Sequence, residues 1–390
     1  MPVLGVFLIV AAVFSVSAQI DPRPDALAAA TPQLRARVRA SSYSYFRFVN
    51  RPWLESVCRR MAEEVPRVPE VHLHGDAHLE QFAVTADAYG LDDFDDSCRG
   101  PAFIDILRFL GSVDVVLRER GWERHREALF DGFFTAYRRA LDRRGFQPPA
   151  PSVVGVLRGR TARTHEQFMA WGESLMEPLS PASLRVTERA MQVFGELIRD
   201  ERPDLPAGFL TLKRAGRIRL GIGSSTTPKL LMRVQGMTPD PSTDQLLEAK
   251  RLGTLDGISC ISVAMVQPSV RVVDGARNLG RLQHDVVLAG PEIFLSPDDA
   301  LGLRLQNWWV RSWDITYREL ALADLRSWHD VAELAADAAA QLATGSVRDS
   351  PDALRVRRDT VSMLDRLEPR LRFETVRMVD DVITGWRRLK

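Results

Sequence analysis

The sequence predicts an α+β protein in which a β-rich middle section lies between two helical sections. Apolar residues recur at helical spacing before Pro203 and again from Trp308 onward, whereas the section between them alternates apolar and polar residues as strands do. A third observation is the acidic stretch Val71–Pro101, which interrupts the first helical section with short apolar runs of strand character. The 390 residues are enough for two or three domains with a substantial core.

Charge and cysteine content narrow the class of protein. The net charge is +1, so no global field would draw the chain to a nucleic acid or to a membrane surface. The three cysteines, Cys58, Cys98 and Cys260, allow one disulfide at most, and none has the CxxC spacing of a thiolate zinc site. We therefore predict that the partner is neither a nucleic acid nor a membrane surface.

The N-terminal stretch resembles a secretory signal peptide. Val3–Val16 is almost purely apolar and Val16-Ser17-Ala18 offers a small-residue cleavage site, although no lysine or arginine precedes the apolar run. The run is too short to span a membrane. Residues 1–18 are therefore predicted to be removed on export to the periplasm or the exterior, leaving no integral membrane span. Without export the protein would be cytoplasmic.

The first helical section begins with Leu34–Asn50, a basic helix that runs into an aromatic patch. We expect the patch to belong to the core, and Arg47 within it to form a structural ion pair or to reach a phosphate. Gly121 stands where the helix after Pro101 needs a left-handed C-cap. The other helices predicted in this section are Trp53–Glu64, Glu123–Arg144, Arg163–Met176 and Ser183–Arg202.

The middle section is predicted to be a small antiparallel sheet. Strands flank a Gly/Ser/Thr-rich turn, a third strand carries Lys250, and Ile258–Val266 and Ser269–Val273 extend the sheet. The last section is again helical, with Ser327–Leu342 the clearest helix and Asp352–Leu389 a pair of helices. The predicted divisions are a signal peptide at 1–18, a helical lobe at 19–205, a β-rich lobe at 206–306, and a hinge-like segment with C-terminal helices at 307–390.

The acidic stretch carries the residues that predict chemistry. Three histidines and Asp76 follow one apolar lead-in, and four aspartates follow the next. Bringing carboxylates together costs free energy unless a cation or hydrogen bonds compensate. Phosphoryl transfer needs a carboxylate near the acceptor hydroxyl and further ligands for a metal that bridges the phosphates. Asp76, Gln81 and the triplet Asp93-Phe94-Asp95 supply those residue types in that order.

Two other interpretations of this stretch are open. Each residue alone is explained by local structure, with Asp76 capping a turn and the histidines packed or hydrogen-bonded. The spacing His72-x-His74-x-Asp76-x-His78 also nearly matches the HxHxDH pattern of metallo-β-lactamase-type enzymes, although it is one residue too long at the last histidine. This second interpretation predicts a zinc-dependent hydrolase.

A further set of residues lies far downstream. Gly221-Ile222-Gly223-Ser224, between two strands, can cover phosphates with backbone N–H groups, although a lone GxG is usually a tight turn. Lys250 on the next strand can pair with phosphate oxygens, and taken alone it is explained as a solvent-facing lysine. The two features support each other because they stand on consecutive predicted strands.

The chain resembles the bacterial family known as domain of unknown function 2252 from about Ser41 to Gly345. Four segments carry the resemblance: HGDAHLEQF, DDFDDSCRGPAFIDILRFLGS, GIGSS with LLEAK, and WWVRSWDITYREL. That family is itself similar to the aminoglycoside phosphotransferase and protein-kinase-like fold. The resemblance implies a two-lobed fold that binds Mg²⁺ and ATP. It assigns Asp76 to the acceptor hydroxyl, Asp105 to bracing the catalytic loop, Asp93 with Asp95 and Gln81 to the metal, and Gly221, Gly223, Ser224 and Lys250 to the phosphates.

The chain departs from the kinase-like pattern in two ways. Gln81 stands where the motif has asparagine, and its longer side chain would hold a second metal less well. The glycine-rich segment follows the catalytic loop, which predicts a circular permutation with Ser327–Leu342 leading into that loop and Trp308–Trp313 as a hinge. The predicted function is a kinase-like, metal-dependent phosphotransferase that acts on an unknown small-molecule substrate. The alternatives are a non-catalytic, pseudokinase-like nucleotide-binding protein and the zinc hydrolase. Export would place the protein where ATP is scarce.

Overall fold

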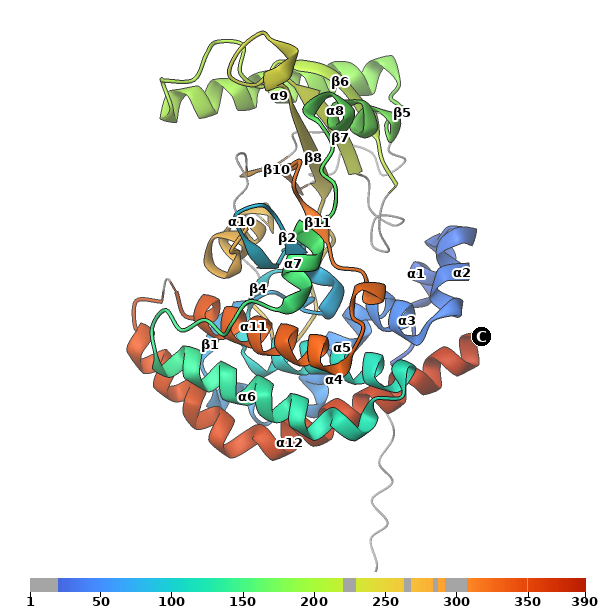
Figure 1. Ribbon diagram of the computed structural model, residues 1–390, viewed down its shortest axis with the longest axis vertical. Coiled ribbons are helices and arrows are strands. Elements are labelled where there is room, and N and C mark those ends of the chain that lie inside the picture. The colour runs from blue at the N-terminus through green and yellow to red at the C-terminus, as the bar shows by residue number, and fades with distance from the viewer. Residues whose placement is uncertain (1–19, 220–228, 263–267, 283–286, 292–306, 349) are drawn as a thin grey trace, which may run out of the picture.

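The computed structural model describes residues 20–219, 229–262, 268–282, 287–291, 307–348 and 350–390. Figure 1 shows two parts, one above the other. The larger part, here called the helical unit, packs helices around short strands, and the smaller part, the sheet unit, is built on one six-stranded sheet. The predicted α+β class is therefore confirmed. The predicted signal peptide lies outside the described residues.

The helical unit has one large hydrophobic core. Helix α5 (Phe103–Arg120) lies at its centre, because every residue from Phe103 to Leu117 is buried. Gly121 follows with φ 69° and ends the helix as predicted. The other helices of this unit are α1 (Pro24–Ala29), α2 (Pro32–Ala40), α3 (Ser42–Phe48), α4 (Asn50–Arg60), α6 (Arg126–Asp142), α7 (Ser152–Arg158), α11 (Trp328–Ser346) and α12 (Ala353–Leu389).

Two predicted helical segments differ from the structure. The stretch predicted as one helix at Leu34–Asn50 is divided into α2 and α3 at Ser41, whose side chain accepts the first N–H groups of α3. The C-terminal pair predicted at Asp352–Leu389 is the single helix α12, which continues through Pro369. An interior proline costs about 3 kcal/mol, and the buried face of α12 extends to both sides of it and offsets that cost. The aromatic patch on α3 is core, as predicted.

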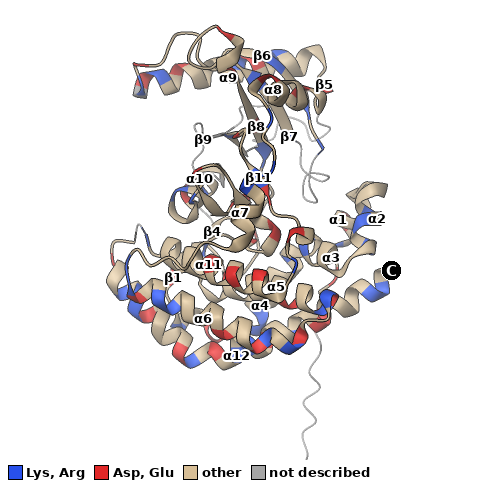
Figure 2. Cartoon of the chain, viewed as in Figure 1, with Lys and Arg blue, Asp and Glu red and all other residues tan. Residues whose placement is uncertain are grey.

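Charged side chains of both signs follow one another along α12 and α6 (Figure 2). Several of them attach α12 to its neighbours. Arg60 of α4 lies 2.8 Å from Glu374 and 2.5 Å from Asp381, and Arg372 lies 3.1 Å from Glu127 of α6. The outer helix is therefore held by ion pairs as well as by its apolar face.

The described residues of the sheet unit form six antiparallel strands in the order β5-β6-β7-β8-β10-β9. Helix α9 (Pro181–Glu201) packs on one face of the sheet, and α8 (His165–Ser174) packs on the other. Helix α10 (Pro268–Leu279) lies between the sheet unit and the helical unit, in contact with β9, β10, α11 and β1. The strands are β5 (Glu177–Pro178), β6 (Leu212–Arg217), β7 (Lys229–Val234), β8 (Gln245–Arg251), β9 (Val287–Pro291) and β10 (Asn307–Ser312).

Three segments around this sheet were predicted wrongly. Ser269–Val273 is the beginning of helix α10 and not a strand, and the described part of Ile258–Val266 forms turns with one isolated bridge, between Ser262 and Arg99. Valine-rich sequence favours strands only weakly, and packing between the two units favours the helix. Residues Trp308–Ser312, predicted as the beginning of the last helical section, lie in strand β10, because alternate residues there are buried on the two faces of the sheet.

The short strands of the helical unit position the two acidic turns. Strand β1 (Glu70–Leu73) pairs with β4 (Cys98–Pro101), and β2 (Phe82–Val84) pairs with β3 (Tyr89–Leu91) and β11 (Arg318–Glu319). One acidic turn, here called the HGD loop (His74–His78), follows β1, and the other, here called the aspartate turn (Asp92–Ser97), follows β3. Both lead-ins are therefore strands, as the sequence predicted.

A disulfide joins Cys58 of α4 to Cys260 in the segment between β8 and α10, with a Cα–Cα distance of 5.3 Å. Arg51 of α4 supports the same contact, donating to Thr254 O at 2.8 Å and to Asp256 O at 2.5 Å. The remaining cysteine, Cys98, is free and buried. The helical unit is thus covalently tied to the segment that leaves the lysine-bearing strand. Among the described residues, no helix combines the length and the apolar character needed to cross a membrane.

Candidate functional site

The candidate site lies where strand β8 meets the acidic turn that follows β3. Lys250 Nζ lies 2.6 Å from Asp93 Oδ1 and 3.4 Å from Asp95 Oδ2. The lysine side chain is buried, whereas the two carboxylates are 32% and 35% exposed. The fold thus brings the predicted phosphate-binding lysine, from 157 residues downstream, onto the predicted metal ligands.

Strand alternation explains why Lys250 faces this turn. Ala249 packs into the core beneath α9, so its neighbours Glu248 and Lys250 point to the opposite face of the sheet. The register with β10 sets Trp309 beside Lys250 and Arg311 beside Glu248 on that same face. Alternate residues of two adjacent strands therefore meet the acidic turn.

Arg311 is a site residue that sequence reasoning missed. Its Nη1 lies 2.6 Å from Asp92 Oδ2 and its Nε lies 3.3 Å from Glu248 Oε2, and all three side chains are buried. Tyr317 Oη donates to the same oxygen of Asp92 at 2.9 Å. The available signal was the alternation in WWVRSW, which places Arg311 on one strand face with Trp309.

The charges around Lys250 separate the pKa values of the two carboxyl groups beside it. Burial raises the pKa of Asp93, but Lys250, Lys229 and Arg311 outweigh burial and hold that pKa below its usual range. Burial, followed by the charge of Asp93, raises the pKa of Asp95 to about 6. Trp309 Nε1 donates to Asp95 Oδ1 at 2.7 Å. Asp93 is therefore the carboxylate that stays ionised at all ordinary pH values.

Asp105 of α5 holds the HGD loop in place. Its Oδ2 accepts the His74 N–H at 2.7 Å and its Oδ1 accepts the Gly75 N–H at 2.9 Å. Gly75 has φ +80°, and a Cβ there would lie 1.9 Å from Asp96 O, so the loop requires glycine at this position. Burial raises the pKa of Asp105. This carboxyl group thus fixes the backbone immediately before Asp76. The family resemblance predicted a residue that braces the loop at this position.

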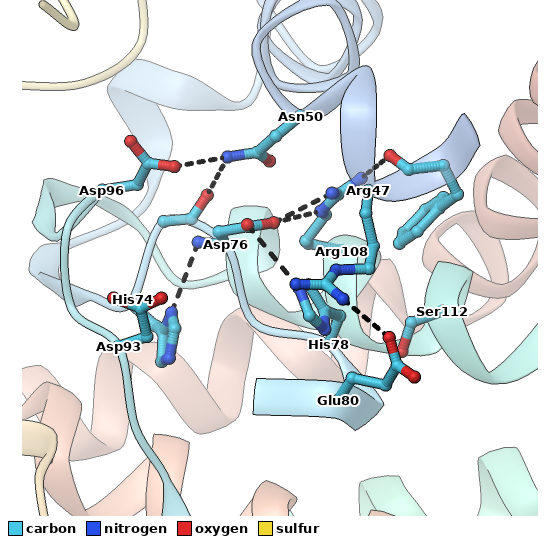
Figure 3. Close-up of polar contacts among 12 residues, drawn as sticks. Arg47, Asn50, His74, Asp76, His78, Glu80, Asp93, Asp96, Arg108 and Ser112 are labelled. Atoms are coloured by element: carbon cyan, nitrogen blue, oxygen red, sulfur yellow. Dashed lines mark hydrogen bonds and ion pairs between the residues drawn. The ribbon is translucent and has the colours of Figure 1, made fainter. Parts of the chain in front are cut away.

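Asp76 itself is held by a buried arginine, as Figure 3 shows. Its Oδ1 accepts from Arg108 Nε at 2.9 Å and lies 2.8 Å from Nη2. Arg108 is 1% exposed and also donates to Phe46 O at 3.1 Å. Burial raises the pKa of Asp76 to about 6 even though Arg108 lowers it. One oxygen of this carboxylate is therefore anchored, and the group titrates close to neutral pH.

The raised pKa of Asp76 predicts a pH-dependent contribution to stability. Because the folded pKa of about 6 exceeds the usual 3.8, the folded state binds the additional proton. This contribution is fully present below about pH 4 and is lost as the pH rises through about 6. We expect the free energy of unfolding of wild type, relative to Asp76→Asn, to fall by about 2–3 kcal/mol between pH 4 and pH 7. Urea denaturation at each pH measures this difference, and a flat difference contradicts the prediction. The exposed Asp365→Asn is the control.

His74 connects the two acidic turns. Its Nδ1 accepts the Asp76 N–H at 3.4 Å, and its Nε2 donates to Asp92 O at 3.0 Å. A backbone N–H can only donate and a carbonyl can only accept, so these two contacts place a ring hydrogen on Nε2 and the accepting lone pair on Nδ1. One imidazole thus holds the HGD loop and the aspartate turn in a fixed relation, and both of its nitrogens are engaged.

The histidines of the zinc interpretation do not converge. His72 Nε2 lies 3.0 Å from Arg99 Nη1 at the surface, whereas the buried His78 has its Nδ1 3.4 Å from Tyr43 Oη. Within the described ranges, no three His, Cys, Asp or Glu side chains are grouped so that they could hold a metal ion. The zinc interpretation therefore gains no support from the geometry.

The aspartate turn has the chemistry expected of a magnesium site. Asp93 and Asp95 both contact the same cationic atom, the ammonium nitrogen of Lys250. Mg²⁺ is usually bound by one or two protein carboxylates together with waters and substrate phosphates, not by a cage of protein ligands. Two carboxylates therefore fit Mg²⁺ when a phosphate is also bound. Gln81, at the end of the short 3-10 turn Leu79–Gln81, is tied to this turn by its carbonyl, which accepts the Asp92 N–H at 2.8 Å.

The remaining predicted residues fall into two groups. Gly221, Gly223 and Ser224 stand between β6 and β7 and lie outside the described residues. Arg47 forms the structural ion pair that was expected, with Glu80 at 2.7 Å. Arg47 is therefore engaged within the helical unit.

Comparison with known proteins gives one match. Residues 27–154 match the model of a family described as an uncharacterized protein conserved in bacteria (DUF2252). The matched segment contains the HGD loop, the aspartate turn and Asp105, and ends before the sheet unit. This supports the resemblance to that uncharacterised bacterial family over the matched segment. No curated protein and no solved structure matches the chain.

Proposed function

We propose that the protein is a metal-dependent phosphotransferase of kinase-like, circularly permuted architecture, which transfers a phosphoryl group from a nucleotide to a small-molecule hydroxyl. The observation that carries this proposal is the 2.6 Å contact between Lys250 Nζ and Asp93 Oδ1. In kinases, the glycine-rich loop joins the first two strands of the β-rich lobe, and a lysine on the third strand of that lobe reaches the phosphates. The aspartate of the DFG triplet holds the metal. Here a glycine-rich segment lies between β6 and β7, and Lys250 lies on β8, the next strand.

The positions of two helices support the permuted order. Helix α11, predicted to lead into the catalytic loop, packs against β1 and β3, the strands that precede the two acidic turns. Helix α10 departs from the kinase pattern, in which a glutamate on the corresponding helix pairs with the lysine. Its Arg271 instead donates to Asp95 O at 2.5 Å and to Ser97 O at 2.9 Å. Arg271 thus attaches this helix to the aspartate turn by donating to two backbone carbonyl groups of that turn.

The backbone at Asp93 also favours a functional role. Asp93 has φ 63°, a left-handed conformation that non-glycine residues rarely adopt and that costs of order 1–3 kcal/mol. The surrounding contacts, including the ion pair with Lys250, hold it there. Strained residues of this kind gather at ligand-binding positions, which is the role proposed for Asp93.

The chemistry assigns a step to each group. The acceptor hydroxyl would lose its proton to Asp76 Oδ2, the oxygen that Arg108 does not hold, as the hydroxyl oxygen attacks the γ-phosphorus. The bond to the bridging oxygen then breaks, and the nucleoside diphosphate leaves. Lys250 would exchange its contact with Asp93 for the phosphate oxygens. Asp93 and Asp95 would hold a divalent cation, whose chemical contribution would be to neutralise charge on the phosphate oxygens.

Binding of Mg²⁺–ATP is the first test. We expect Mg²⁺ with ATP to raise the melting temperature, with a stabilisation of about 2.7 kcal/mol at a ligand concentration 100 times the Kd. The Asp93→Asn variant should lose the magnesium-dependent part, because one of the two carboxylates is gone. The exposed Asp365→Asn should keep the full shift. Equal magnesium-dependent shifts of the melting temperature in wild type and Asp93→Asn would contradict the proposed metal site.

A second candidate is a protein of the same architecture that binds a nucleotide without transferring phosphate. The disulfide between Cys58 and Cys260 favours it, because disulfides persist in oxidising compartments and ATP is scarce outside the cytoplasm. Release of ADP from ATP, followed in the presence and absence of candidate acceptors, separates the two functions. Binding with no ADP release under any condition supports the second candidate.

A further inference from the structure

We propose that Tyr43 and His78 form a hydrogen-bonded chain that presents the imidazole Nε2–H to Asp76 Oδ2, so that His78 is a positioning residue for this carboxylate. The consequence for catalysis rests on the proposed function. The contact itself concerns only the protein and is tested without a nucleotide. Figure 3 shows His78 and Arg108 on different oxygens of Asp76.

The direction of the chain follows from its first member. The backbone N–H of Glu80 donates to Tyr43 Oη at 3.2 Å, which occupies that oxygen as an acceptor. The Tyr43 hydroxyl hydrogen also needs an acceptor, and His78 Nδ1, 3.4 Å from Tyr43 Oη, is the acceptor that the described residues offer it. An imidazole that accepts at Nδ1 carries its hydrogen on Nε2. Tyr43 therefore selects the tautomer of His78.

His78 is fully buried, and its position keeps the ring neutral. Burial lowers the pKa of His78 well below its usual value, and the nearby cations Arg47 and Arg108 lower it further. Its Nε2 makes no hydrogen bond to any described residue, and its neighbour is Asp76 Oδ2 at 3.7 Å. A buried N–H group without a hydrogen bond is rare. This one faces a carboxylate oxygen, and an approach of about 0.5–1 Å brings the two atoms to hydrogen-bond distance.

The two oxygens of Asp76 thus have different partners. Arg108 holds Oδ1 with its Nε and Nη2, and His78 faces Oδ2, the oxygen that would receive the acceptor proton. The other charged or titratable groups that face Asp76 are Asp96 of the aspartate turn, Arg47 of α3 and His74 of the HGD loop. A hydrogen bond from His78 favours the ionised carboxylate and fixes its plane. His78 would thereby keep Asp76 in the proton-accepting form.

The test measures the pKa of Asp76 by carbon NMR of the labelled carboxyl group, assigned with Asp76→Asn. We expect His78→Phe, which removes the donor, to raise this pKa by about one unit. His78→Gln, which supplies an N–H near the same place, should restore most of the wild-type value. Tyr43→Phe should raise the pKa by less, because the ring can then change tautomer. Tyr45→Phe makes the same change on another buried tyrosine of α3 and should leave the pKa unaltered.

Two results would overturn the proposal. One is an unchanged Asp76 pKa in a folded His78→Phe variant, and the other is a shift that His78→Gln does not reverse. If His78→Phe fails to fold, nitrogen NMR of the wild-type imidazole decides, since hydrogen on Nδ1 contradicts the chain and hydrogen on Nε2 supports it. Because these measurements need no nucleotide, they can succeed where Mg²⁺–ATP binding fails, and the reverse also holds.

Discussion

Arg311→Met is expected to lower the free energy of unfolding by about 3–5 kcal/mol, because it removes the buried cation that pairs with both Asp92 and Glu248. Glu248 keeps Lys229 as a second cation at 3.5 Å. The side chain of Arg311 is 7% exposed, and those of its partners Asp92 and Glu248 are 2% and 4% exposed. Methionine preserves most of the apolar volume, so the loss reports on charge and not on a cavity. Guanidinium denaturation followed by tryptophan fluorescence measures it.

Two control experiments show whether the loss of stability in Arg311→Met comes from its buried charges. Arg355→Met breaks the exposed pair of Arg355 with Asp352, whose side chains are 58% and 63% exposed, and should cost less than about 1 kcal/mol. Adding Asp92→Asn and Glu248→Gln to Arg311→Met removes every charge of the triad and should recover much of the loss. A cost for Arg311→Met as small as that of Arg355→Met would show that the triad is solvated.

The same substitution also bears on the proposed function. Asp92 immediately precedes Asp93, and Arg311 attaches it to the strand beside Lys250. Arg311→Met should therefore release the aspartate turn and weaken the Mg²⁺–ATP shift even at temperatures where the variant is fully folded.

Removing the disulfide with Cys58→Ser and Cys260→Ser is the second large effect. The cysteines are 202 residues apart. For a loop of that length the chain-entropy model gives about 5 kcal/mol of stabilisation, and loss of native disulfides typically costs about 2–5 kcal/mol. We expect the double variant to melt at a clearly lower temperature than oxidised wild type, and to be insensitive to a reducing agent that lowers the melting temperature of wild type.

The third cysteine supplies the control for that experiment. Cys98→Ala removes a buried free thiol, keeps the disulfide, and should retain the full response to the reducing agent. Thiol titration of the unfolded, unreduced protein should find one free thiol. Three free thiols would contradict the pairing of Cys58 with Cys260.

Local features of the chain could be predicted because neighbouring residues carry their signals. Gly121 as a C-cap, α5 after the GPAFID segment, and the strands before the acidic turns depend on spacing and backbone preference within a few residues. The bracing contact of Asp105 had no such signal, and its assignment came only from the resemblance. Valine content misled the prediction at Ser269–Val273, where burial between the two units decides for a helix.

The sequence by itself determined the α+β class, the two acidic turns and the identity of Asp76, Asp93 and Lys250 as candidates, because residue type and periodicity are local properties. Only the tertiary structure decided that Lys250 and Arg311 meet the aspartate turn, and that Cys58 pairs with Cys260. These contacts join segments more than 150 residues apart. They exist because one face of strands β8 and β10 packs against the helical unit, and which distant surfaces bury one another is a property of the whole chain.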